Sequence, residues 1–214
     1  DTTLITEAVK AVHDSEIALV FVGSSSTAFV RHSNEPSTSG EGIDLSDISL
    51  TGAQEQLIRS VCATGKPVVV VLVAGKPFAI PYIKEKVPAI LAQWYAGEQA
   101  GNSIADILFG KVNPSGKLPF SFPQSTGHLP AYYNYLPTDK GYYKEPGTYT
   151  SPGRDYVFSS PAPLWTFGHG LSYTRFEYVQ ATTDKTSYQP HDTIRISVKV
   201  KNSGKLAGKE VVQI

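Results

Sequence analysis

The chain has 214 residues, enough for one large or two small domains, and its 41% hydrophobic and 18% charged content is that of a globular protein. Its 19 basic and 19 acidic residues give zero net charge without a basic stripe, which disfavours a nucleic-acid partner. No apolar run approaches the roughly 20 residues of a bilayer span, and no leader-like segment occurs, so we expect no membrane partner. The single cysteine, Cys62, excludes an internal disulfide, and no Cys/His spacing indicates a metal site or cofactor.

Helical and strand patterns alternate along the first 110 residues. Residues 17–22 and 68–73 are short apolar runs, of the kind that form strands buried on both faces of a parallel sheet, and residues 89–95 are expected to form a third strand. Apolar residues at helical spacing predict helices at residues 2–15, 78–84 and 101–109, and a further helix with Leu57, Ile58, Val61 and Cys62 on its inner face, capped at Thr51 and ended by Gly65. The alternation predicts an α/β fold, a mostly parallel sheet sandwiched by helices.

Two helix ends have recognisable signals. Thr51 and Gln54 have the spacing of a capping box, in which the Thr51 hydroxyl accepts the amide of residue 54 and Gln54 reaches back. Gly65, with Pro67 close behind, ends that helix. Pro81 either interrupts or begins the helix predicted at residues 78–84.

The second half of the chain differs from the first in composition and in the spacing of its apolar residues. Residues 117–170 are rich in Pro, Gly, Tyr and Phe, which indicates an ordered segment that wraps a surface rather than a disordered linker. Residues 194–200 alternate apolar and polar side chains and a turn follows at residues 202–204, which predicts an antiparallel hairpin. A β-sandwich needs about 100 residues, so we expect the chain to stop inside a second domain, with residues 211–214 ending in mid-strand.

Glu41 lies between two glycines in the loop that follows the first predicted strand. Glycine lacks a Cβ, so the backbone there bends freely and lets another molecule approach closely. In parallel α/β sheets, ligand-contacting groups lie on loops at the carboxyl ends of strands. On the residues alone, Glu41 is a general acid, a metal ligand or an ordinary solvated charge.

Six stretches, in this order and spacing, resemble the C-terminal part of glycoside hydrolase family 3, the β-glucosidases and β-xylosidases. Each stretch is weakly informative alone, whereas the ordered set is specific and covers almost the whole chain. They are residues 39–44 (SGEGID), 66–72 (KPVVVVL), 94–101 (WYAGEQAG), 105–110 (ADILFG), 113–119 (NPSGKLP) and 167–174 (FGHGLSYT).

The resemblance implies three parts. Residues 1–125 correspond to an α/β sandwich domain that carries the acid/base loop, 126–175 to an aromatic-rich wrapping segment, and 176–214 to the truncated start of a fibronectin type III-like domain, a partial all-β sandwich. It also implies a retaining β-glucosidase that releases glucose from the non-reducing end of β-glucoside oligosaccharides. The family's nucleophile is an aspartate on a separate (β/α)8 barrel, in a Ser-Asp-Trp or Thr-Asp-Trp context that this sequence lacks.

By the same resemblance, Glu41 corresponds to the family's catalytic acid/base. One departure concerns Leu45, since many members have arginine there, and this puts the local ion pairing in doubt but not the glutamate. Glu35 is the alternative acid/base, although Pro36 restricts its backbone and no flanking glycine helps it to approach a sugar.

Several other side chains have a structural interpretation beside a functional one. Glu98 is expected to favour a helix N-terminus, His169 to pack in a turn, and Trp94 and Trp165 to make core or domain contacts rather than stack on sugar. The candidates for an outer sugar site, which the sequence leaves open, are Arg31, His32, Arg154 and Tyr156.

Two rival classes and one rival substrate remain. A nucleotide-binding α/β domain predicts a glycine fingerprint after the first strand, which is absent. A non-catalytic carbohydrate-binding or scaffold fragment fits the same fold, since fold does not fix function. β-Xylosidase is the alternative activity. A homodimer is possible, and a secreted or periplasmic location is favoured.

Overall fold

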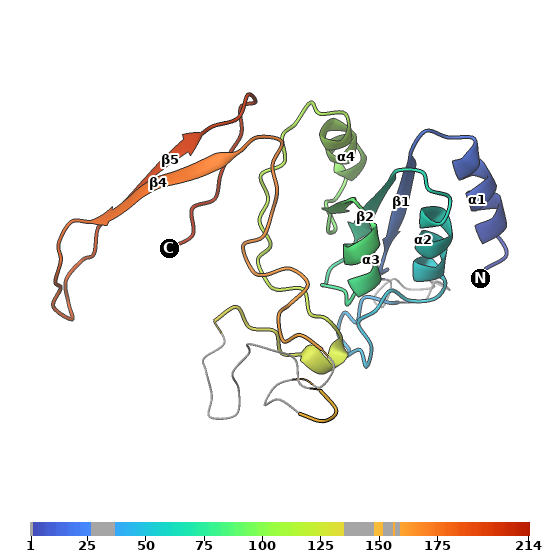
Figure 1. The fold of residues 1–214 in the computed structure, drawn as a ribbon, viewed down its shortest axis with the longest axis horizontal. Helices are drawn as coiled ribbons and strands as arrows, with labels where there is room; N and C mark the ends of the chain where they lie inside the picture. The colour runs from blue at the N-terminus through green and yellow to red at the C-terminus, as the bar shows by residue number, and fades with distance from the viewer. Residues whose placement is uncertain (1, 27–36, 135–147, 152–155, 157–158) are drawn as a thin grey trace. The chain divides into compact units, whose positions relative to one another are not determined.

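The computed structural model describes residues 2–26, 37–134, 148–151, 156 and 159–214 of the chain (Figure 1). It contains two compact units, each built from two stretches of sequence. The first unit comprises residues 1–100 and 119–167, and the second comprises residues 101–118 and 168–214. The sequence-based boundaries at residues 125 and 175 remain predictions.

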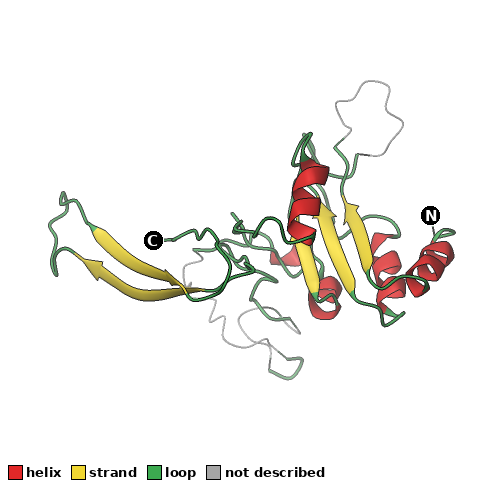
Figure 2. Cartoon of the chain, turned by 90° about the horizontal axis from the view of Figure 1, so that it is seen from above, coloured by secondary structure: helices red, strands yellow, loops and turns green. Residues whose placement is uncertain are grey.

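A parallel sheet of three strands forms the centre of the first unit (Figure 2). Its strands are β1 (Ala18–Gly23), β2 (Val68–Val73) and β3 (Ala89–Ala92), in spatial order β1–β2–β3. The β-branched run of β2 suits a central strand, and its Val70 and Val71 side chains are fully buried. The predicted α/β fold with a parallel sheet is therefore confirmed.

Three helices of the first unit pack around this sheet. They are α1 (Ile5–His13), α2 (Gln54–Cys62) and α3 (Pro81–Lys86). Helix α2 contacts α1, α3 and strand β1, and its Ile58 and Val61 side chains are buried. Gly65 ends the turn after α2 with φ 73°, a left-handed conformation that glycine adopts without strain.

Three predictions about these elements need correction. Strand β1 is not buried on both faces, because Leu19 and Phe21 remain 45% and 53% exposed while their alternate neighbours are buried. Helix α3 begins at Pro81, which confirms that alternative for the proline, but residues 78–80 are not helical. Strand β3 stops at Ala92 rather than continuing to residue 95.

The capping box predicted at Thr51 and Gln54 does not form. Helix α2 has no side-chain cap hydrogen bond, and its N-cap is Ala53. Gln54 instead pairs with the backbone of Gly23, 31 residues away: its Oε1 accepts from the Gly23 N–H at 2.7 Å and its Nε2 donates to the Gly23 carbonyl at 3.0 Å. The Gln54 side chain therefore satisfies the end of strand β1 as well as reaching back to the Thr51 carbonyl.

The second unit combines helix α4 (Ala100–Leu108, of which Ala100 belongs to the first unit) with an antiparallel pair of strands, β4 (Phe176–Thr183) and β5 (Ile196–Asn202). The predicted alternating strand is present and its pairing is antiparallel, but its partner is the preceding strand β4 rather than a strand that follows a turn at residues 202–204. Residues 211–214, expected to be a strand, are not in one.

Asn113 ties the segments of the second unit together. Its Oδ1 accepts hydrogen bonds from the Ser172 hydroxyl at 2.8 Å and the Tyr173 N–H at 2.7 Å. Its Nδ2 donates to the Ala207 carbonyl at 2.9 Å. One amide side chain therefore joins three parts of the unit, and two of them belong to the sequence stretches 113–119 and 167–174.

Two aromatic rings of the Pro-, Gly- and aromatic-rich stretch 117–170 contact each other within the first unit. Phe122 is 2% exposed and lies edge-on to Trp165, with ring centroids 5.5 Å apart. Their backbones also bond, because the Phe122 N–H donates to the Trp165 carbonyl at 2.8 Å. Residues 135–147, 152–155 and 157–158 lie outside the described part, and the wrapping role of the segment remains a prediction.

Candidate functional site

The loop that carries Glu41 returns to the carboxyl end of strand β1. Ser25 lies two residues beyond β1, and its carbonyl accepts from the N–H groups of Thr38 and Ser39 at 2.9 and 3.0 Å. The Thr38 hydroxyl in turn accepts from the Ser25 N–H at 2.9 Å. These three bonds fix the N-terminal arm of the loop, and they place Glu41 two residues beyond a held position.

Glu41 occupies the exposed tip of this loop. Its neighbours Gly40 and Gly42 both have left-handed backbone, with φ 77° and 73°. The turn closes where the Ile43 N–H donates to the Gly40 carbonyl at 3.1 Å, and the Ser39 hydroxyl accepts from the Glu41 N–H at 3.2 Å. The two glycines therefore serve the sharp turn that presents the carboxylate.

Leu45 packs against the inside of this tip. A Cβ built on Gly40 would lie 2.8 Å from the Leu45 Cγ, closer than real side chains approach. Many members of the family that this sequence resembles have arginine at this position. Here the leucine side chain fills the space next to Gly40. Its role at this position is packing rather than ion pairing.

The C-terminal arm of the loop is held at Ile48, which is buried. The Ile48 carbonyl accepts from the Ala79 N–H at 3.0 Å, and its own N–H donates to the Thr126 hydroxyl at 3.3 Å. The residues between β2 and α3, which were expected to be helical, make this contact instead. The loop that carries Glu41 is consequently tethered on both sides.

Asp47, next to this anchor, has its pKa lowered from the usual value. The main cause is the Ser49 N–H, which donates to Asp47 Oδ1 at 2.8 Å, followed by the Ser49 hydroxyl, which donates to Oδ2 at 2.9 Å. The Lys76 ammonium adds a smaller effect of the same sign. Burial in turn lowers the pKa of Lys76, whose Nζ has no hydrogen-bond partner among the described residues.

We expect the Asp47→Asn variant to lose stability near neutral pH by less than about 1 kcal/mol, since exposed charges are screened. A carboxyl with a lowered native pKa stabilises the fold above the unfolded pKa of about 3.9 and loses that contribution as pH falls through the native value. The difference in unfolding free energy between variant and parent should therefore shrink from pH 6 to pH 3. Urea midpoints at both pH values measure it, with Asp44→Asn on the same loop as control. A difference in unfolding free energy that grows in acid would contradict the lowered pKa of Asp47.

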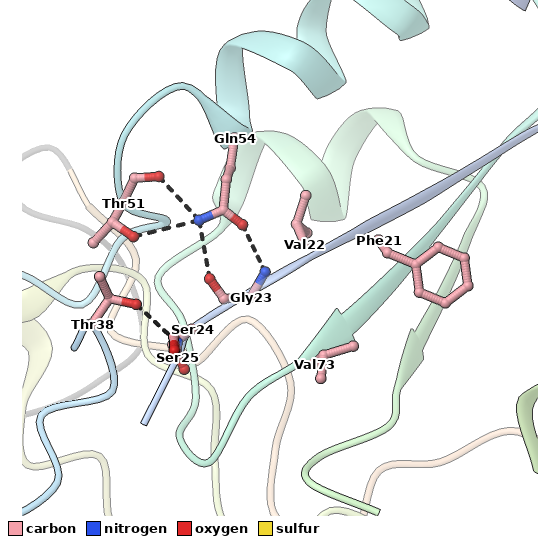
Figure 3. Close-up of a pocket in the computed structure, with 9 residues that line it drawn as sticks. All are labelled: Phe21, Val22, Gly23, Ser24, Ser25, Thr38, Thr51, Gln54 and Val73. Atoms are coloured by element: carbon pink, nitrogen blue, oxygen red, sulfur yellow. Dashed lines mark hydrogen bonds between the residues drawn. The ribbon is translucent and has the colours of Figure 1, made fainter. Parts of the chain in front are cut away.

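A shallow hollow of about 430 Å³ lies at the end of strand β1, beside Gln54 (Figure 3). Its polar groups bond to one another, Gln54 to Gly23 and Thr51, and Thr38 to Ser25, as the dashed lines in Figure 3 show. Glu41 is not among the residues that line it. The hydrogen bonds of these lining residues therefore hold the base of the loop against the end of strand β1.

The other candidate residues have different surroundings. Glu35, Arg31, His32 and Arg154 lie outside the described residues. The Tyr156 ring lies against His128, with ring centroids 3.9 Å apart and the planes tilted by 31°. The Trp94 ring lies edge-on to Phe120 at 5.2 Å, and Trp165 lies edge-on to Phe122, so both tryptophans make internal aromatic contacts. Glu98 and His169 are exposed, and the His169 carbonyl accepts from the Leu118 N–H at 2.8 Å.

The described part of the chain contains no group of three or more His, Cys, Asp or Glu side chains that could hold a metal ion. None of its helices combines the length and the apolarity that crossing a membrane requires.

Sequence reasoning missed the residues that hold the loop. Ser25, Thr38, Thr126 and Ala79 were not singled out, and each acts through contacts with residues distant in the chain. Only the polar Ser/Thr content of the loop base hinted at such bonds, because these side chains often bond to nearby backbone.

Comparison with known proteins gives a consistent result. Residues 2–173 match the family described as "Glycosyl hydrolase family 3 C-terminal domain". The chain is 41% identical to a β-xylosidase of Formosa agariphila, over 97% of this chain and 26% of that protein. It is also 41% identical to the thermostable β-glucosidase B of Acetivibrio thermocellus, over 100% of this chain and 27% of that protein.

Solved structures show the same relationship. The crystal structure of a β-glucosidase from Listeria innocua superposes with a TM-score of 0.80 at 32% identity, over 95% of this chain and 26% of that one. The chain thus spans about a quarter of the length of the relatives it matches.

Proposed function

Because this chain belongs to the family of glycosyl hydrolase family 3 C-terminal domains, we propose that it forms the C-terminal part of a retaining β-glucosidase. In this proposal the enzyme releases glucose from the non-reducing end of β-glucoside oligosaccharides. Family membership makes glycosidase chemistry the expectation. The observation that carries the assignment within this chain is the presentation of Glu41 on an exposed tip between two left-handed glycines.

Glu41 acts as the acid/base in the proposed mechanism. As an acid it protonates the glycosidic oxygen while a carboxylate nucleophile attacks the anomeric carbon. As a base it then takes a proton from the water that releases the sugar. Retention requires the two carboxyls to lie about 5–5.5 Å apart, so the nucleophile must approach this tip. We assign it to a (β/α)8 barrel outside this chain.

The tethered loop suits this task. A general acid has to meet one oxygen atom in one geometry, and both arms of the Glu41 loop are held by backbone hydrogen bonds at Ser25 and Ile48. The exposed tip leaves room for a barrel and a sugar to cover the carboxyl. Covering excludes water, and a carboxyl removed from water keeps its proton more readily.

We further propose that strands β4 and β5 are the first strands of a fibronectin type III-like domain. The pair is antiparallel, and its side chains are largely exposed. An isolated two-stranded hairpin is marginally stable in water, so we expect more strands to pack on it. The boundaries at residues 125 and 175 belong to this proposal.

β-Xylosidase is the second candidate, and the 41% identity with the Formosa agariphila β-xylosidase favours it. The two sugars differ by one hydroxymethyl group. Comparing kcat/KM of the complete enzyme on matched aryl β-glucosides and β-xylosides decides between them. A preference for the xyloside would replace the proposed substrate and leave the mechanism unchanged.

The stereochemistry of the first product tests the retaining mechanism. Proton NMR during hydrolysis of an aryl β-glucoside by the complete enzyme should show β-glucose first, with α-glucose appearing later by mutarotation. The 214-residue chain alone should release no product, because it lacks the nucleophile. Initial formation of α-glucose would overturn the retaining mechanism. Turnover by the chain alone would overturn the proposal that the acid/base and the nucleophile lie in different domains.

A further inference from the structure

We propose that Tyr95 is a positioning residue for the loop that carries Glu41, acting through its hydrogen bonds to Ser24. The inference rests on the proposed function, in which Glu41 is the acid/base. It adds a group that touches neither substrate nor reacting atoms and that fixes where the acid stands.

The Tyr95 hydroxyl joins the ends of two strands that are not neighbours in the sheet. It donates to the Ser24 carbonyl at 2.9 Å and lies 3.1 Å from the Ser24 hydroxyl. Ser24 directly follows β1, Tyr95 follows β3, and β2 lies between them. The tyrosine ring spans this gap over Gly75, where a Cβ would lie 2.9 Å from the ring Cε2. A glycine after β2 therefore makes room for the ring.

The backbone before Tyr95 is held in an uncommon conformation. Trp94 has φ 58°, in the left-handed region that residues other than glycine rarely adopt. Such a conformation persists only where its surroundings enforce it. Here the indole lies edge-on to Phe120 at 5.2 Å and 6.2 Å from Phe122. These contacts fix the position of the backbone from which the Tyr95 side chain extends.

The peptide bond from Ser24 to Ser25 and a set of hydrogen bonds from Ser25 onward connect Ser24 to Glu41. Ser25 follows Ser24 and exchanges three hydrogen bonds with Thr38 and Ser39. The Ser39 hydroxyl accepts from the Glu41 N–H at 3.2 Å. Any movement of Ser24 is therefore passed to the N-terminal arm of the loop. Misplacing a reacting group by about 1 Å can cost roughly 100-fold in rate, so a modest shift is measurable.

The test is Tyr95→Phe in the complete enzyme, which removes the hydroxyl and keeps the ring over Gly75. Tyr173→Phe is the matched control, since that hydroxyl also donates to a backbone carbonyl at 2.9 Å, of Ile107 in α4. The two tyrosines are equally exposed, at 47% and 48%. Each variant thus loses one hydroxyl and a comparable hydrogen bond to backbone.

We expect Tyr95→Phe to lower kcat on a disaccharide about tenfold, part of the 10²–10⁴ that a general acid contributes. The first step on an aryl glucoside with a very good leaving group should change less than about twofold, because that step needs little protonation. Tyr173→Phe should leave both rates unchanged. A merely structural role would slow both substrates equally, and that result would overturn the proposal.

A double variant separates this inference from the function on which it rests. In a Glu41→Gln background the acid is absent, so adding Tyr95→Phe should cause no further loss on the disaccharide. A further loss would show that Tyr95 does not act through Glu41. If Glu41→Gln itself behaves unlike an acid/base variant, the proposed function fails. If Tyr95→Phe does not fold, Ser24→Ala, which removes only the 3.1 Å contact, should show the same substrate dependence to a smaller degree.

Discussion

Glu41→Gln in the complete enzyme should lower the cleavage of a β-linked disaccharide by about 10²–10⁴, the usual contribution of general acid catalysis. Glutamine has nearly the same shape as glutamate, so the loop tip between its two glycines should keep its geometry. What disappears is the proton for the departing sugar oxygen, which a poor leaving group needs most. Steady-state rates on cellobiose-type substrates measure this loss.

The same variant should respond differently with an activated aryl glucoside. Its leaving group departs without protonation, so glycosylation of the nucleophile survives. The second step has lost its base, so the glycosyl-enzyme accumulates, a burst of aryl product appears and KM falls. Azide attacks without needing a base, and it should restore turnover and yield a β-glycosyl azide.

Glu98→Gln is a suitable control for this experiment, because Glu98 is also exposed and is assigned no part in the reaction. Its rates on both substrates should stay within about twofold of the parent, as for ordinary surface substitutions. A Glu41→Gln variant that slows all substrates equally and ignores azide would show that Glu41 is not the acid/base. Glu35→Gln would then be the next variant to test.

Phe78→Ala should destabilise the protein by about 3–5 kcal/mol, the range for removing a buried phenylalanine side chain. Phe78 is 1% exposed and lies beside Ala79, whose N–H holds the Ile48 carbonyl. The substitution leaves a cavity in the core and loosens one anchor of the Glu41 loop. Urea unfolding measures the first effect, and the disaccharide rate of the folded variant measures the second.

Phe109→Ala is the matched substitution at the surface, since Phe109 is 81% exposed. It removes the same atoms from a position that buries little area, so its free energy of unfolding should stay within about 0.5 kcal/mol of the parent. Equal losses for the two variants would mean that Phe78 does not lie in the core.

The central strands could be predicted because their local pattern and their environment agree. β2 is a continuous β-branched run, and the structure buries it at the centre of the sheet. β1 has a similarly apolar run, yet one of its faces is half exposed. Apolar content shows that a residue can be buried, whereas the coverage of a particular face depends on other segments that no local window contains.

The errors at helix ends share a cause. Thr51 and Gln54 have the spacing of a local cap, but the Gln54 amide finds a better pair of partners on Gly23, 31 residues away. The stretch before Pro81 likewise bonds to Ile48 instead of continuing a helix backward. Both cases are tertiary hydrogen bonds that override a local preference.

The flanking glycines and the family resemblance were enough to predict Glu41 as the candidate acid. They did not predict the residues that hold its loop in place. The two glycines are visible in sequence, and both adopt the left-handed backbone that only glycine accepts easily. The bonds that hold the loop join Ser25 to Thr38 and Ile48 to Thr126. Such pairings depend on the folded path of the chain, so no spacing rule predicts them.

The interleaving of the two units has a consequence for protein synthesis. Asn113 bonds to Tyr173, 60 residues further along, and to Ala207, 94 residues further along. A ribosome adds about 5–20 residues per second, so Asn113 waits roughly 3–12 s for its first partner and 5–19 s for its second. During that interval residues 119–167, which belong to the other unit, are made. The first unit can therefore close before the second has received its last strand, and Asn113 lacks these two hydrogen-bond partners in the meantime.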